Sequence, residues 1–139
     1  MPLLYTTKAT VTGGRDGVAV LANGGLTINM STPKELGGTG GMGSNPEQLF
    51  AAAYATCFLS SMNFVASQGG PMVPPNAMVT ATVGIGPSAH GGFGIDVQLD
   101  IALPGLPPAD AGALVNRAHL VCPYSHATRN NVPVRLVVI

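Results

Sequence analysis

Two cysteines, Cys57 and Cys122, are the residues of this chain with the most specific chemistry. A cysteine thiolate is a nucleophile, and two thiols that meet can be joined in a disulfide. Disulfides in a reducing compartment are mostly transient, catalytic or sensing. The cysteine count alone favours two inert thiols, because free cysteine is among the most buried residue types. Whether the two thiols are reactive or inert therefore depends on the residues around them.

Cys57 falls inside an apolar helical pattern, and apolar surroundings raise the pKa of a thiol unless a positive charge lies nearby. Because the chain has only six Lys and Arg residues, and burying a charge costs free energy, an arginine beside Cys57 would indicate a function for that thiol. Cys122 precedes Pro123, which suits the start of a helical turn, where free backbone N–H groups favour a thiolate. The residues that share the helix face of Cys57 are Phe50, Ala53, Tyr54, Ser61 and Phe64.

The stretch from Ser44 to Gln68 positions Cys57, and it predicts one long helix. Asn45 is a good N-cap, Pro46 fits the first helical position, and Gly69-Gly70-Pro71 ends the pattern. The helix is apolar almost all round, so we expect it to be buried on every side, partly by a second subunit. We reject a membrane span because the helix has no basic flank and carries the polar residues Gln48, Thr56, Ser60, Ser61 and Asn63.

The other elements frame this helix in an α+β fold with a mostly antiparallel sheet and helices on one side. Alternating patterns predict an N-terminal meander of three strands, a hairpin after the helix, and a closing strand. Helical spacing precedes Cys122, and Pro123 opens a short turn that runs through Arg129. The predicted strands are 3–11, 18–22, 26–30, 77–85, 93–103 and 132–139, and the second helix is 110–121.

Composition limits the classes of function. A chain of 139 residues is expected to form one domain, 1–139. Only 9% of residues are charged, the net charge is zero, and no basic patch indicates a nucleic-acid partner. The apolar fraction of 46% favours an oligomer. Met1–Leu4 has no basic region of the kind that starts a signal peptide, so we expect a cytoplasmic protein.

A glycine-rich loop, Thr32–Gly43, contains a formal match to the dinucleotide fingerprint G-x-G-x-x-G at Gly38–Gly43. No predicted strand precedes it directly, and no acidic residue follows at the distance that would bind a ribose. We therefore interpret it as a tightly turning entry loop to the helix, of a kind that can border an active site.

The two cysteine segments, PEQLFAAAYATCF (Pro46–Phe58) and AHLVCPYSHATRNN (Ala118–Asn131), resemble the two motifs of the organic hydroperoxide resistance proteins, the Ohr branch of the OsmC/Ohr family. The segment GGRDG (Gly13–Gly17) and the glycine-rich loop also match. The resemblance covers essentially the whole chain in order, and the VCPYS form points to the Ohr branch rather than the OsmC branch.

This resemblance implies a thiol-dependent peroxidase without metal, haem or flavin. Carried over by motif, Cys57 would be the peroxidatic thiolate and Cys122 the resolving thiol, and Arg15 with Glu47 would be the charged pair that activates Cys57. The implied fold is OsmC/Ohr-like, with mostly antiparallel sheets around a long central helix, in an intertwined homodimer with active sites at the interface.

The resemblance also implies organic and fatty-acid hydroperoxides as substrates, and a dihydrolipoyl group on a lipoylated protein as the external reductant. An apolar lining suits an alkyl chain better than hydrogen peroxide. The candidate lining residues are Phe50, Tyr54, Phe58, Phe64 and Met42.

One geometric expectation follows from the helix itself. Glu47 and Cys57 would lie roughly 15 Å apart along one helix axis. We therefore predict that Arg15 and Glu47 serve Cys57 of the other subunit, across two long helices that pack antiparallel.

Several alternatives stay open. An OsmC-type enzyme would accept a broader range of peroxides, and a non-catalytic protein would bind an apolar ligand at the dimer interface. A zinc site at His119, Cys122 and His126 is disfavoured because Pro123 breaks the helix between them and Cys57 would have to complete it. A Cys–His hydrolase with His126 as base leaves the second cysteine unexplained.

The end of the second motif has a local role. Arg129 and Asn130 are expected to cap or brace the Cys122 turn. The family usually has Gly where this chain has Asn130, and Asn tolerates the left-handed conformation.

Overall fold

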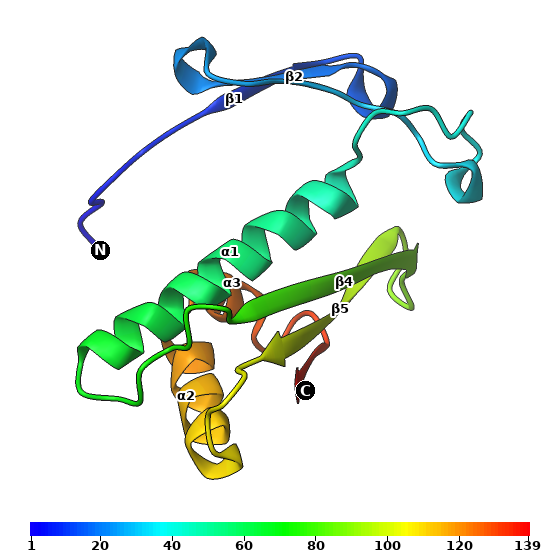
Figure 1. Cartoon of the computed structure of the whole chain (residues 1–139). Coiled ribbons are helices and arrows are strands. Elements are labelled where there is room, and N and C mark those ends of the chain that lie inside the picture. Colours follow the sequence, from blue (N-terminus) through cyan, green and yellow to red (C-terminus); the bar gives the residue numbers. More distant parts are fainter. The chain divides into compact units, whose positions relative to one another are not determined.

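The computed structural model describes all residues from Met1 to Ile139, in two compact units, Met1–Leu49 and Phe50–Ile139 (Figure 1). The long helix α1 (Pro46–Ser67) begins in the first unit and continues through the second. The α+β class and the long helix are as predicted. The single domain over 1–139 and the homodimer stay predictions.

The first unit is a three-stranded antiparallel meander, as predicted, with the order β1-β2-β3. The turn between β2 and β3 has left-handed backbone at Asn23 (φ 66°) and Gly24 (φ 62°), which is what a tight hairpin requires. The predicted strand 3–11 is wrong over residues 3–8, because β2 offers partners only from Leu21 to Val18. The strands are β1 (Ala9–Thr12), β2 (Val18–Leu21) and β3 (Thr27–Asn29).

The start and end of α1 confirm the signals in the sequence. The side-chain oxygen of Asn45 accepts a hydrogen bond from the N–H of Gln48 at 2.9 Å, and the Gln48 side chain accepts one from the N–H of Asn45 at 3.1 Å. This reciprocal pair satisfies two of the N–H groups that a helix start leaves unpaired. Gly69, with φ 96°, follows the last turn.

In the single chain α1 is covered on one side, so the expectation that a second subunit covers the rest stays a prediction. Only one face is buried, and within its most apolar 18-residue window 28% is covered. The reason is that the hydrophobic core lies against one side only. By length and apolarity alone α1 is long enough to cross a membrane, although a core helix meets the same criterion. Its buried residues are Tyr54, Phe58, Ser61, Met62 and Val65.

The second unit combines a three-stranded sheet with most of α1 and with the two helices α2 and α3. Its strand order is β4-β5-β6, in which β4 and β5 form the predicted antiparallel hairpin and β6 pairs with β5 in parallel. The hairpin loop is shorter than expected, because Gly86 and Pro87 still pair with Gly94 and Phe93. The elements are β4 (Met78–Pro87), β5 (Phe93–Ala102), α2 (Pro108–Val121), α3 (Pro123–Thr128) and β6 (Val134–Val138).

Strand β5 supplies the sheet side of the core. Val97, Leu99 and Ile101 are completely buried, whereas Asp96 and its alternate neighbours face outward. This alternation is the pattern of a sheet with one wet face. The buried side chains pack with the inner face of α1 and with Leu114 and neighbouring residues of α2. The core thereby fixes the backbone on which both cysteines lie.

The cap of α1 can be tested by mutation. We expect Asn45→Ala to lower the free energy of unfolding by about 1 kcal/mol, because an N–H of the first turn loses its acceptor. Chemical denaturation measures the change. Asn116→Ala, at an exposed position inside α2, is the matched control and should stay within about 0.5 kcal/mol of wild type. Equal losses in both variants would contradict the capping role.

Candidate functional site

The first unit brings together two predicted site residues, Arg15 and Glu47. Arg15 Nη1 donates to Glu47 Oε2 at 2.9 Å, and Nη2 donates to Oε1 at 2.6 Å. This two-pronged pairing of guanidinium and carboxylate holds both side chains in one plane. The Arg15 side chain is 34% exposed and that of Glu47 is 15% exposed. The pair therefore presents an oriented guanidinium that still reaches solvent.

The electrostatics of this pair favour its charged form. The hydrogen bonds from Arg15 lower the pKa of Glu47 more than partial burial raises it. The same hydrogen bonds raise the pKa of Arg15. Glu47 consequently stays a carboxylate well into the acid range, and the pair opens only as the pH falls through that lowered pKa.

The GGRDG segment forms a turn that aims Arg15. Residues Gly14–Asp16 make a single 3₁₀ turn, and Gly13 enters it with φ 76°. At Gly17 an added Cβ would lie 1.7 Å from the carbonyl oxygen of Thr12, so no other residue fits there. Asp16 Oδ1 accepts the N–H of Thr32 at 2.9 Å and ties the turn to the start of the glycine-rich loop.

The second unit holds both cysteines, and both are free thiols. Cys57 on α1 is partly buried and lines a mostly apolar pocket of about 350 Å³. Val121 and Pro123, the two neighbours of Cys122, form the opposite wall of that pocket. The chain thus folds the two cysteine segments around one hollow. The pocket is lined by Cys57, Ser60, Ser61, Phe64, Val121 and Pro123.

The surroundings of Cys57 disfavour its thiolate. Burial raises the pKa of this thiol, and the negative charge of a Cys122 thiolate raises it further. A cation beside Cys57 would offset this effect, because a nearby positive charge lowers the pKa of a thiol.

Cys122 lies at the junction of α2 and α3 and is completely buried. Its N–H donates to the carbonyl of Ala118 and so ends α2, and its own carbonyl accepts the N–H of His126 and so begins α3. Its backbone is extended (φ −65°, ψ 124°), which separates the two helices. The residue that follows, Pro123, fills the first position of α3 as predicted.

Arg129 braces this junction, as expected. Pro123 has no N–H to donate to the carbonyl of His119, which a continuing helix would have paired. Arg129 Nη2 donates to that carbonyl at 2.7 Å instead. Asn130 next to it has φ 61°, so it adopts the left-handed conformation that it was expected to tolerate.

Buried side chains beside the same junction form a chain of hydrogen bonds that no pattern in the sequence predicted. Tyr54 Oη and Ser125 Oγ are 2.8 Å apart, and Ser125 Oγ and His119 Nδ1 are 2.7 Å apart. Thr128 Oγ1 lies 3.2 Å from Tyr54 Oη and donates to the carbonyl of Ser125. Serine and threonine in a short helix are ordinary turn residues, so their types carried no signal; only their position after Cys122 could have suggested a role.

The residues predicted to line the substrate site lie in different surroundings. Phe64 is 55% exposed and lines the Cys57 pocket. Phe50 packs edge-on against Tyr54, with ring centres 6.0 Å apart. Tyr54 and Phe58 are completely buried, so in this chain they support the wall from behind. Met42 is fully exposed in the glycine-rich loop of the first unit. Their contact with substrate stays a prediction.

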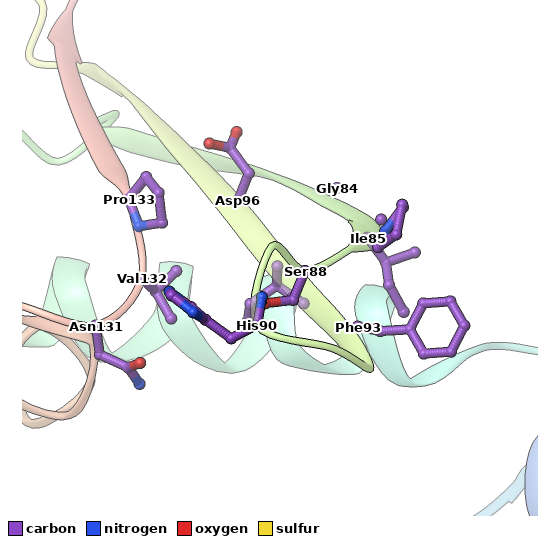
Figure 2. A pocket seen from close by; sticks show the side chains of 13 residues that line it. Gly84, Ile85, Ser88, His90, Phe93, Asp96, Asn131, Val132 and Pro133 are labelled. Atoms are coloured by element: carbon purple, nitrogen blue, oxygen red, sulfur yellow. The ribbon is translucent and has the colours of Figure 1, made fainter.

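A larger hollow, of about 830 Å³, lies away from the cysteines at the tip of the β4–β5 hairpin. Figure 2 shows Ser88, Ile85 and Phe93 on one side of it and Asn131, Val132 and Pro133 on the other. None of the predicted site residues lines it. Its size alone therefore gives it no catalytic meaning.

Comparison with known proteins identifies the family. The family model described as OsmC-like protein matches residues 38–137. The organic hydroperoxide resistance protein of Xanthomonas axonopodis pv. citri is 53% identical over 134 residues, which cover 96% of this chain and 94% of that protein.

Two solved structures have the same fold. An organic hydroperoxide resistance protein from Elizabethkingia anophelis superposes with a TM-score of 0.92 at 46% identity, covering 99% of this chain and 98% of that one. A putative organic hydroperoxide resistance protein from Vibrio cholerae, with captopril bound in one of its active sites, gives 0.92 at 45% identity, covering 99% and 94%. The chain belongs to the OsmC/Ohr family, in the branch of the organic hydroperoxide resistance proteins.

Proposed function

We propose that this protein is a thiol peroxidase that reduces organic hydroperoxides to alcohols through a Cys57–Cys122 disulfide. The observation that supports this most directly is an apolar pocket lined both by the partly accessible free thiol Cys57 and by Val121 and Pro123, the two neighbours of the buried free thiol Cys122. The relatives named for organic hydroperoxide resistance support the substrate class.

The chemistry balances with two thiols and one external dithiol. The Cys57 thiolate attacks the outer oxygen of R–O–O–H, the O–O bond breaks, and the alkoxide leaves with a proton as the alcohol. The resulting Cys57 sulfenic acid condenses with the Cys122 thiol, which releases water and forms the disulfide. A dithiol such as a dihydrolipoyl group on a lipoylated protein reduces this disulfide by thiol exchange and is itself oxidised to a cyclic disulfide.

Arg15 is the cation that the buried thiol requires. Its guanidinium lowers the free energy of the Cys57 thiolate and donates hydrogen bonds to the peroxide oxygens, while Glu47 fixes its direction through the two bonds at 2.9 and 2.6 Å. Because Glu47 and Cys57 are about 15 Å apart along α1, the guanidinium comes from the other subunit of a homodimer.

Two observations support a dimer. The outer faces of α1 are apolar but uncovered in the single chain, as the 55% exposure of Phe64 illustrates. The Vibrio cholerae relative has more than one active site, since captopril occupies one of them. We also propose a cytoplasmic location, where a reducing environment restores free thiols between turnovers.

Peroxide turnover tests the proposal. We expect purified protein to consume cumene hydroperoxide with dihydrolipoamide as electron donor, and Cys57→Ser to lose this activity completely. Cys122→Ser should complete one oxidation of Cys57 and then accumulate sulfinic acid, because no second thiol resolves the sulfenic acid. Mass spectrometry distinguishes these species. Absence of turnover with dihydrolipoamide and with dithiothreitol would favour the alternative of a non-catalytic protein that binds an apolar ligand.

The proposed role of Arg15 can be tested through the pH dependence of the oxidation rate of Cys57. We expect Arg15→Gln to raise the pH at which the oxidation rate of Cys57 is half-maximal, because the thiolate loses its stabilising cation and its pKa rises. The measurement is the single-turnover oxidation rate as a function of pH. Arg135→Gln is the matched control, since Arg135 makes the same two-pronged pair with Asp96 on an exposed surface of the second unit. An unchanged pH profile in Arg15→Gln would remove the activating role.

Mixed dimers test which subunit supplies the guanidinium. At neutral pH, Arg15→Gln alone should have a strongly reduced rate, because its Cys57 thiol has a raised pKa, and Cys57→Ser alone should have none. In a dimer with one subunit of each kind, one site combines an intact Cys57 with Arg15 of its partner, so we expect about half of the wild-type rate. If Arg15 acted on Cys57 of its own chain, the mixed dimer would keep a strongly reduced rate.

A further inference from the structure

The hydrogen-bonded chain Tyr54–Ser125–His119 links the helix of one cysteine to the turn of the other. Tyr54 lies one helical turn before Cys57 on α1, and Ser125 lies one turn after Cys122 on α3. Their side-chain oxygens are 2.8 Å apart. This is the side-chain hydrogen bond that joins the backbone around Cys57 to the backbone around Cys122.

The link is buried and fully paired. Tyr54 and Ser125 have no exposed surface, Thr128 is 4% exposed, and no buried side-chain polar atom lacks a partner. A consistent set of protons exists with neutral His119: the tyrosine hydroxyl donates to Ser125 Oγ, the serine hydroxyl donates to His119 Nδ1, and Thr128 donates to the carbonyl of Ser125. Such a closed arrangement in a low-dielectric interior is rigid and is costly to break.

The third member, His119, extends the link to α2. Its imidazole receives the serine hydroxyl, while its backbone carbonyl receives Arg129 at 2.7 Å. Cys122 sits between α2 and α3 on an extended residue, where a single ψ rotation would swing the thiol. The hydrogen bonds of His119 with Ser125 and with Arg129 connect the segments before and after Cys122, and so they hold the ψ angle of Cys122.

We propose that Ser125, His119 and Tyr54 are positioning residues that hold the Cys122 thiol at bonding distance from Cys57 for the resolving step. This inference rests on the proposed peroxidase function. The resolving step forms one Sγ–Sγ bond, breaks the S–O bond of the sulfenic acid, and releases water with the thiol proton. A disulfide demands a Cα–Cα distance within a narrow range and a fixed torsion, so the step depends on the relative placement of the two backbones.

If this proposal is right, loss of the link affects disulfide formation but not the first oxidation of Cys57. Loss of the link leaves the attack of Cys57 on peroxide unchanged, because that step does not involve Cys122. The link instead sets the competition between disulfide formation and a second oxidation of the sulfenic acid by peroxide. A residue that only stabilised the fold would not shift this competition.

The test measures both steps in the full-length protein by rapid mixing with cumene hydroperoxide and mass spectrometry. We expect Ser125→Ala to slow disulfide formation about fivefold, the order expected from one net hydrogen bond. The ratio of sulfinic acid to disulfide at Cys57 should rise by the same factor at a fixed peroxide concentration. The rate of the first oxidation should equal that of wild type.

Two further comparisons keep the test sharp if Ser125→Ala folds poorly. His119 is only partly buried, so its variants are tolerated more easily. His119→Asn places an acceptor near the position of Nδ1 and should keep the resolving rate, whereas His119→Leu should lose it. Tyr124→Phe is the matched control, because Tyr124 packs on the ring of Tyr54 at 5.7 Å but lies outside the chain of hydrogen bonds.

The outcomes are distinguishable from failure of the proposed function. If wild-type Cys57 is not oxidised by the hydroperoxide, the peroxidase proposal fails. If wild-type protein resolves normally, and Ser125→Ala and His119→Leu show the wild-type ratio of sulfinic acid to disulfide, the positioning role is overturned. Equal slowing in Tyr124→Phe would also overturn it, because the effect would then follow from local packing.

Discussion

An apolar environment around a thiol that must ionise is the constraint on which this structure depends. Burial raises the pKa of Cys57, and the nearby thiol of Cys122 raises it further. In the proposed mechanism the same apolar wall would admit an alkyl chain, so the chain could not simply expose the thiol. A fixed cation would resolve this conflict, and the paired Arg15 and Glu47 would provide one, since a carboxylate that holds the guanidinium by two bonds limits its freedom to turn toward solvent.

The second constraint concerns the backbone around the buried Cys122. This thiol is completely buried at the junction of two helices that Pro123 separates. The proline leaves the carbonyl of His119 without its usual donor, and Arg129 fills that position from the other end of α3. The unpaired carbonyl and the arginine that pairs with it thus lie in one short segment. That explains why a proline, an arginine and a left-handed Asn130 occur together after the cysteine.

Local signals predicted the elements well, because each depends on few neighbours. Asn45, Pro46 and Gly69 define α1 through capping and backbone conformation alone. The first strand was predicted too long, since its length depends on its partner β2 and not on its own residues. The pairing of Arg15 with Glu47 and the hydrogen bond of Tyr54 with Ser125 join residues far apart in sequence, and only the first could be anticipated, from family motifs. Hydroxyl side chains give no sign of their partners until the fold is known.

The apolar surface of α1 connects these two constraints. A helix with one buried face normally carries charged residues on the other, whereas α1 has none from Leu49 to Ala66 and leaves Phe64 exposed. Covering this surface with a second copy would bury apolar area and, in the same step, bring a foreign Arg15 to a thiol that its own helix spacing keeps roughly 15 Å from Glu47. In the proposed mechanism, assembly and activation are then one event: a lone chain would have a thiol of raised pKa and be inert, and the dimer would supply the charge that makes it reactive.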